Sequence, residues 1–156
     1  MSDFREPIYR SATYTSVRNW RERLGRYRLV GSQCSECEAA FFPRRPACMR
    51  CDSRKMKPYQ CAHTGTVVSV WPKPGITRLS GYEDLPPGHV GMVRLDDGVH
   101  IETEIVGLTR EQSKPGLRVG LVFRKLRRET NGNETYGYKF AAIQEPGKSP
   151  EPGMAI

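Results

Sequence analysis

The sequence predicts a mainly β protein made of a short N-terminal helix, a zinc ribbon and a five-stranded barrel of the OB type. Three observations predict it. Residues 15–25 carry apolar side chains at helical spacing, four cysteines form two Cys-x-x-Cys pairs, and five segments after Gly65 have strand composition. We expect an N-terminal arm and helix over 1–28, the ribbon over 29–60, the barrel over 61–143 and an extended tail over 144–156.

The helix is predicted from N-capping residues and from apolar side chains at helical spacing. Thr15 and Ser16 supply a helix N-cap, and Val17, Trp20 and Leu24 recur at the spacing of one helical face. Gly25 is expected to end the helix, and residues 26–33 to form a strand leading into the first cysteine pair. The other face is rich in arginine. The helix either packs its stripe on the domain or presents a binding surface to a partner.

The metal site is predicted from the cysteines Cys34, Cys37, Cys48 and Cys51. Ten residues separate the two pairs, and we expect them to form a short hairpin that returns the second pair to the first. Without an export signal the thiols are expected to stay reduced, so this spacing predicts structural zinc. Iron in a rubredoxin-like site and a thioredoxin-type redox pair are the alternatives. Four sulfurs complete a zinc tetrahedron and leave no position for substrate.

The apolar residues near the cysteines have separate expected roles. Phe41 and Phe42 lie between the two pairs and are expected to form the small apolar plug of the ribbon. So few apolar residues cannot build a core without a metal. Cys61 belongs to neither pair, and we expect it to pack as a small apolar residue.

The barrel is predicted from five β-rich segments, at 66–71, 90–95, 99–106, 117–126 and 135–143. An Asp-Asp-Gly turn ending at Gly98 joins the second and third segments, which is a strong hairpin signal. The longest connections follow the first and third segments, which favours a five-stranded Greek-key barrel of the OB type. Residues 144–156 are rich in proline and glycine and form no predicted element.

Composition limits the class of protein. The chain has 156 residues, 37% of them hydrophobic, and no apolar run approaches the roughly 20 residues that span a bilayer. Its first residues lack the apolar core of a secretion signal, so we expect a soluble, cytoplasmic protein. The formal charge of +8 points to an anionic partner such as nucleic acid, a phosphorylated cofactor or an acidic protein face.

Four phrases of the sequence resemble one known family. They are Trp20-Arg-Glu-Arg-Leu-Gly-Arg-Tyr-Arg-Leu-Val-Gly-Ser-Gln-Cys34, Phe42-Pro-Arg-Arg-Pro-Ala-Cys48, Thr64-Gly-Thr-Val-Val-Ser-Val-Trp71 and Pro115-Gly-Leu-Arg-Val-Gly-Leu-Val-Phe123. In this order they resemble the acyl-CoA-associated proteins that join a rubredoxin-like zinc ribbon to an OB-fold barrel. The resemblance runs from about Trp20 to Ile143. It implies a non-catalytic accessory subunit of a thiolase-like or related acyl-CoA enzyme, assembled as a hetero-oligomer.

The resemblance also implies that this subunit stabilises the catalytic subunit and helps to form or bridge an acyl-CoA site, with the catalytic residues on the partner. Coenzyme A carries phosphates and an adenine ring, so arginine or lysine near an aromatic ring is the chemistry required. The candidate contacts are Arg44, Arg45, Lys73 and Arg78.

Two other function classes are open. A nucleic-acid-binding module is the main alternative, because ribbons and OB barrels both bind nucleic acids and residues 124–128 form a basic run. The barrel strands show no evident set of alternating exposed aromatic residues for base stacking, which argues against it. An independent hydrolase or transferase is the third class. His63, His89 and His100 lie in no catalytic motif, and Glu102 with Glu104 could form a carboxylate pair or a solvated sheet face.

Overall fold

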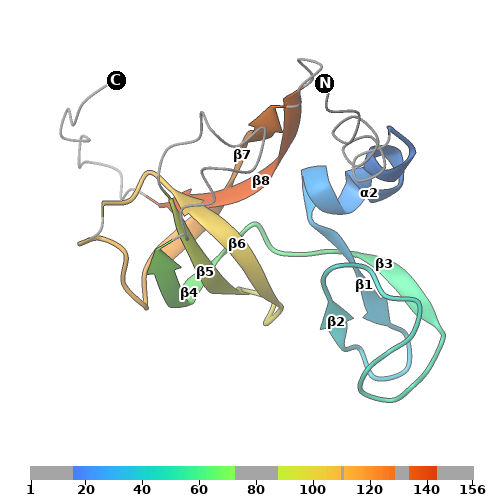
Figure 1. Cartoon of the computed structure of the whole chain (residues 1–156). Coiled ribbons are helices and arrows are strands. Elements are labelled where there is room, and N and C mark those ends of the chain that lie inside the picture. The colour runs from blue at the N-terminus through green and yellow to red at the C-terminus, as the bar shows by residue number, and fades with distance from the viewer. Residues whose placement is uncertain (1–15, 73–87, 110, 129–133, 144–156) are drawn as a thin grey trace, which may run out of the picture.

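The computed structural model describes residues 16–72, 88–109, 111–128 and 134–143 (Figure 1). In chain order the elements are α2 (Ser16–Arg28), β1 (Val30–Cys34), β2 (Ala40–Phe41), β3 (Met56–Gln60), β4 (Thr64–Pro72), β5 (His89–Leu95), β6 (His100–Val106), β7 (Arg118–Arg128) and β8 (Glu134–Ala142). The predicted tail over 144–156 and the arm before α2 lie outside these residues. No described helix is long and apolar enough to cross a membrane.

The strands form two sheets, one in the ribbon and one in the barrel. In the ribbon β1 lies between β2 and β3, with Gln33 opposite Ala40 and Val30 opposite Gln60. The sequence analysis missed β3, whose short run Met56-Lys-Pro-Tyr-Gln60 includes a proline. The strand is formed because five successive residues of β1 pair with it.

The second sheet closes on itself in the order β4-β5-β6-β8-β7, which confirms the five-stranded OB barrel. All its pairings are antiparallel except β6 with β8, which is parallel. The predicted turn ends at Gly98, whose φ of 85° suits glycine. Alternate residues of the strands point inward to form the core, which includes Val67, Val93, Ile105 and Phe140.

The predicted end of the helix is wrong. α2 continues past Gly25 to Arg28, so 26–28 are helical and β1 begins only at Val30. The chain leaves the helix at Leu29, which has a φ of 53° and donates its backbone N–H to the Gly25 carbonyl at 3.0 Å. Leu29 is fully buried in the barrel core. Burying this side chain fixes where the helix ends, a tertiary effect that outweighs the local glycine signal.

The segment between the cysteine pairs also differs from the prediction, because it is not a hairpin of its own. Its only strand, β2, pairs back onto β1, so the hairpin encloses the first cysteine pair. Phe42 also differs from the prediction, because it does not pack within the ribbon alone. Its ring meets that of Tyr138 edge-on, with centroids 5.6 Å apart, and packs against the barrel core.

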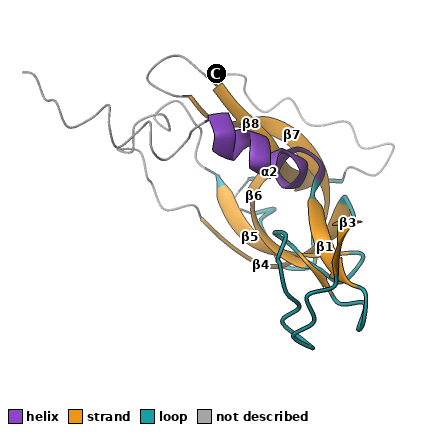
Figure 2. Cartoon of the chain, turned by 90° about the vertical axis from the view of Figure 1, so that its right-hand side faces the viewer, coloured by secondary structure: helices purple, strands orange, loops and turns teal. Residues whose placement is uncertain are grey.

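Helix α2 lies beside the barrel near β8 (Figures 1 and 2). Tyr27 meets the ring of Phe123 on β7 edge-on at 5.6 Å. Gly137 on β8 leaves room for this packing, because a Cβ there would lie 3.1 Å from Arg26 Cγ and 2.7 Å from Leu126 Cδ1. Side-chain contacts therefore hold helix α2 on the barrel.

Candidate metal centre and interaction surface

The two cysteine pairs of the ribbon come together in space. The sulfurs of Cys34, Cys37, Cys48 and Cys51 all lie within 4.8 Å of one another. Cys34 Sγ is 3.6 Å from Cys51 Sγ, and Cys37 Sγ is 3.5 Å from Cys48 Sγ. Sulfurs of a regular zinc tetrahedron lie about 3.8 Å apart, so the cluster fits one tetrahedral ion.

Backbone N–H groups point at the sulfurs of Cys34 and Cys48 and favour their thiolate forms. At Cys51 the Ser53 N–H lowers the pKa, but the neighbouring thiols and burial outweigh it and raise the pKa to about 12. The N–H groups of Cys37 and Glu36 lower the pKa of Cys34 to about 6, although burial opposes the shift. At Cys48, burial raises the pKa but the N–H groups of Arg50 and Cys51 outweigh it. Thiolate is the form that binds metal, so the two turns favour metal binding at neutral pH.

The fifth cysteine lies apart from the cluster. Cys61 is 1% exposed and belongs to the barrel core, and burial, helped by the charge of Asp97, raises its pKa to about 11. A thiol held neutral in an apolar site is a packing residue, as the sequence indicated.

The apolar stripe of α2 faces solvent. Val17 is 55% exposed, Trp20 66%, Leu24 38% and Tyr27 45%. These four positions recur at intervals of three and four residues, so they lie on one helical face. Arg23 covers one side of the stripe, with its guanidinium 3.7 Å from the centroid of the Trp20 ring. Of the two roles left open for this helix, the exposure favours a surface for a partner.

The exposed stripe continues onto the barrel. Tyr27 contacts Phe123, and the ring of Phe123 stacks on that of Tyr136 with centroids 5.9 Å apart and an angle of 17°. Phe123 is 48% exposed and Tyr136 40%. We call the six residues of this continuous apolar strip the aromatic strip: Val17, Trp20, Leu24, Tyr27, Phe123 and Tyr136.

Phe123 on β7 and Tyr136 on β8 thus form a pair of exposed aromatic residues across two strands rather than an alternating set along one strand. Phe123 and Tyr136 were not identified, because only the pairing of β7 with β8 places them side by side. The spacing of Tyr136 and Tyr138 was the available signal, since alternate residues of a strand share one face.

The four predicted coenzyme A contacts are only partly described. Arg44 and Arg45 are exposed on the ribbon segment after β2, and the Arg45 backbone N–H donates to the Ser32 hydroxyl at 3.0 Å. Lys73 and Arg78 lie outside the described residues. Arg44 and Arg45 are adjacent in sequence and both are exposed, and all four coenzyme A contacts stay predictions.

The polar residues weighed for catalysis occupy separate places. His63 is exposed just before β4, His89 is half-buried at the start of β5, and His100 is exposed at the start of β6. Glu104 pairs with Lys139 at 3.0 Å, whereas Glu102 is exposed on the same strand. Among the described residues these groups do not converge on a shared catalytic geometry.

Family models match both parts of the chain. The model described as ChsH2, rubredoxin-like zinc ribbon domain, matches residues 21–57, and that described as ChsH2, C-terminal OB-fold domain, matches residues 59–124. These matches agree with the ribbon sheet, the four-cysteine cluster and the barrel.

Archaeal relatives extend the match over most of the chain. A DUF35 domain-containing scaffold protein of Pyrococcus furiosus is 35% identical over 129 residues, which cover 81% of this chain and 91% of the relative. A protein of the same description from Methanocaldococcus jannaschii is 32% identical over 135 residues, covering 82% and 91%.

A solved structure shares the fold. The chain is similar to one in the structure described as Ltp2-ChsH2(DUF35) aldolase, with a TM-score of 0.56, 23% identity and coverage of 85% of this chain and 93% of that chain. The resemblance drawn from the sequence is confirmed: the chain belongs to the ChsH2/DUF35 family, whose members join a rubredoxin-like zinc ribbon to a C-terminal OB-fold domain.

Proposed function

We propose that this chain is a non-catalytic scaffold subunit of a thiolase-type acyl-CoA complex. In this proposal it stabilises the catalytic subunit and helps to form or bridge the acyl-CoA site, while the reacting groups lie on the partner. The archaeal relatives are described as scaffold proteins, and the similar structure is described as an Ltp2-ChsH2(DUF35) aldolase. The metal proposed for the four-cysteine cluster is zinc with a structural role, because four sulfurs leave no open position.

The aromatic strip is the observation that carries the proposal. It contains two-thirds-exposed Trp20 and runs from α2 across Phe123 to Tyr136. Continuous exposed apolar patches on soluble proteins mark interaction sites, and tryptophan and tyrosine dominate binding energy when a partner covers them. Arginines beside the strip, including Arg23, would suit a partner with carboxylates at the edge of an apolar surface.

The acyl-CoA part of the proposal rests on the ribbon. Arg44 and Arg45 are neighbouring, exposed cations, which is the chemistry that phosphate groups require. We propose that they face the acyl-CoA site in the assembled complex, together with Lys73 and Arg78. Replacing Arg44 and Arg45 by glutamine would then raise the KM for acyl-CoA in the complex without changing its assembly.

Assembly tests the scaffold role directly. The chain is co-expressed with a thiolase-like subunit and the product is analysed by size-exclusion chromatography and native mass spectrometry. We expect a complex of fixed stoichiometry. Trp20→Ser should weaken it by about thirtyfold, because truncating a central tryptophan typically costs about 2 kcal/mol or more.

Trp71→Ser is the matched control, because Trp71 is also an exposed tryptophan, 38% exposed, but lies on β4 outside the aromatic strip. It should leave assembly unchanged. A chain that stays monomeric beside the thiolase-like subunit would contradict the scaffold role, and equal effects of the two substitutions would contradict the role of the strip.

A nucleic-acid-binding module is the second candidate, since the exposed aromatic residues lie close to Arg124 on β7. Two observations weigh against it. The rings of Tyr27, Phe123 and Tyr136 already contact one another, and the Tyr136 hydroxyl donates to the Glu134 carboxylate at 2.8 Å. The same carboxylate pairs with Lys125 at 3.1 Å, so a cation beside the rings is already occupied and is not free for phosphate. Salt-dependent binding of single-stranded oligonucleotides would support this candidate, and no binding at low salt would remove it.

A further inference from the structure

The four cysteines of the metal cluster differ in their exposure. Cys34 and Cys48 are buried, with exposed fractions of 0% and 2%, and Cys37 is half-buried, whereas Cys51 is exposed. When the cluster holds a metal, all four sulfurs are thiolates, which is the form that reacts with oxidants. Exposure then decides which sulfur an oxidant in solution meets first, and that sulfur belongs to Cys51.

A second sulfur lies beside that of Cys51. The Sγ atoms of Cys51 and Cys34 are 3.6 Å apart, and those of Cys37 and Cys48 are 3.5 Å apart. Both contacts join the first cysteine pair to the second. Redox-sensitive cysteines are typically solvent-accessible thiolates with a second thiol next to them, and Cys51 with Cys34 meets both conditions.

We propose that the four-cysteine cluster is an oxidation-sensitive switch, which loses its metal when a peroxide forms a disulfide between Cys51 and Cys34. The inference rests on the structural zinc of the proposed function. It goes beyond that function because it gives the cluster a regulatory role in addition to a structural one.

The step is a two-electron oxidation of two thiolates. The Cys51 sulfur attacks one oxygen of hydrogen peroxide, the O–O bond breaks, and the other oxygen takes up a proton and leaves as water. The Cys34 sulfur then displaces the hydroxyl group from the Cys51 sulfur, which forms the disulfide and, with a second proton, a second water. The two thiolates lose two electrons, and the peroxide gains them.

The disulfide removes two of the four metal ligands. Structural zinc requires four, so Cys37 and Cys48 alone do not hold it and the cluster loses its metal. The ribbon has only three short strands and little apolar core of its own. Without metal its strands should therefore loosen.

Loosening of the ribbon would uncover the fifth cysteine. Cys61 is 1% exposed, and Gly31 of β1 lies over its thiol, because a Cβ on Gly31 would be only 3.2 Å from Cys61 Sγ. On the barrel side, the backbone N–H of Ala62 donates to the Asp97 carboxylate at 2.8 Å. Movement of β1 would thus expose the Cys61 thiol while the barrel keeps the residue in place.

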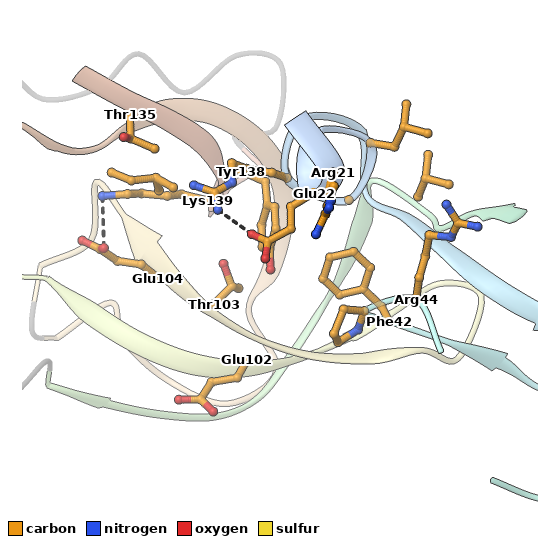
Figure 3. Close-up of a pocket in the computed structure, with 16 residues that line it drawn as sticks. Arg21, Glu22, Phe42, Arg44, Glu102, Thr103, Glu104, Thr135, Tyr138 and Lys139 are labelled. Carbon is orange, nitrogen blue, oxygen red and sulfur yellow. Dashed lines mark hydrogen bonds and ion pairs between the residues drawn. The ribbon is translucent and has the colours of Figure 1, made fainter. Parts of the chain in front are cut away.

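The same movement would reach the contact between the ribbon and the barrel. Phe42 of the ribbon and Tyr138 of the barrel both line the cavity between the helix, the ribbon and the barrel, and their rings meet edge-on at 5.6 Å (Figure 3). Phe42 directly follows β2, so its position depends on the ribbon sheet. Oxidation of the cluster would therefore change the junction of the two units as well as the metal site.

Hydrogen peroxide added to the full, zinc-loaded chain tests the switch. Zinc release is followed with a chromogenic chelator, the disulfide by peptide mass spectrometry, and the exposure of Cys61 by maleimide labelling mapped to that residue. We expect loss of the bound zinc together with formation of the Cys34–Cys51 disulfide, and labelling of Cys61 only after oxidation. Reduction with dithiothreitol in the presence of zinc should restore the protected state.

Two substitutions by histidine locate the sulfur that reacts first. Cys51→His and Cys37→His each leave three cysteines and one histidine, a ligand set that holds structural zinc. Cys51→His removes the exposed thiolate, so peroxide should release zinc several-fold more slowly than from the native chain. Cys37→His is the matched control, because it keeps Cys51 and Cys34 and should release zinc at about the native rate. The disulfide map of the native chain identifies the reacting sulfurs independently of both variants.

The outcomes separate this proposal from the proposed function. Zinc that stays bound under peroxide, a disulfide that excludes Cys51, equal rates for the two variants, or a Cys61 that stays unlabelled after zinc is lost would each overturn the switch and leave the structural zinc standing. A native chain that purifies without zinc would overturn both. Assembly with the thiolase-like subunit is measured separately, so the scaffold role stands or fails on that experiment alone.

Discussion

Side-chain hydrogen bonds to a single residue, Asp96, hold the ends of three barrel strands together. The Asp96 carboxylate at the β5 turn accepts hydrogen bonds from both terminal nitrogens of Arg118, at 2.6 and 3.0 Å, and one from the Thr64 hydroxyl. These three residues come from β4, from the β5–β6 turn and from β7. The hydrogen bonds from Arg118 are the main cause that lowers the pKa of Asp96 from 3.8 to about 2.

This shift predicts a pH dependence. A carboxyl group whose pKa is lower in the folded state stabilises that state fully above pH 3.8, and the contribution is lost as the pH falls through about 2. Asp96→Asn should therefore lower the urea midpoint at neutral pH, and its difference from the native chain should shrink between these two pH values. Arg118→Gln should show the same window. A difference that stays constant across it would contradict the assignment.

The barrel and the ribbon differ in the interactions that stabilise them. The barrel buries a core of aliphatic residues and Phe140, whereas the ribbon has only three short strands and its Phe42 packs toward the barrel. A unit with so little apolar surface of its own depends on another source of stability. A zinc ion held by the four-cysteine cluster would supply it, because binding of structural zinc contributes on the order of 10 kcal/mol at neutral pH.

Cys48→Ser should therefore unfold the ribbon and leave the barrel folded. Hydrogen exchange followed by mass spectrometry should show lost protection over β1 to β3 and retained protection over β4 to β8. Metal analysis should find one zinc per native chain and none in the variant. Cys61→Ala is the control, because Cys61 lies outside the cluster and its loss should leave the metal content unchanged. Retained protection of the ribbon in the metal-free variant would show that it folds without metal.

At the scale of the whole molecule, α2 links the two units. Its outer face carries the first four residues of the aromatic strip, and its inner side lines a cavity of about 700 Å³ between the helix, the ribbon and the barrel. The packing of α2 on the barrel depends on Gly137, because Leu126 and Arg26 occupy the space that a side chain at residue 137 would need.

Gly137→Val should displace these side chains and loosen α2 from the barrel. Overpacking of this kind typically costs about 1–3 kcal/mol, so we expect a lower urea midpoint and faster amide exchange in α2. Gly137→Ala should have a smaller effect, and combining Gly137→Val with Leu126→Ala should recover part of the loss. Unchanged exchange in α2 would show that its position does not depend on this contact.

The sequence by itself determined the parts and the metal ligands. Cys34 and Cys37 are close in sequence, as are Cys48 and Cys51, so local turns alone bring each pair together and the spacing reveals the site. The alternation in the barrel segments and the turn at Gly98 are also local signals, which is why the five strands were predicted with small errors at their ends.

Only the tertiary structure decided the end of α2, the existence of β3, the aromatic strip and the cavity. Each depends on contacts between distant residues: Leu29 in the barrel core, β3 on β1, Tyr27 on Phe123, and Phe42 on Tyr138. Local propensity can identify an apolar stripe, but whether the stripe is buried or exposed is fixed by which surfaces the rest of the chain has already covered. The free energy of packing is a property of the whole fold, and no short segment encodes it.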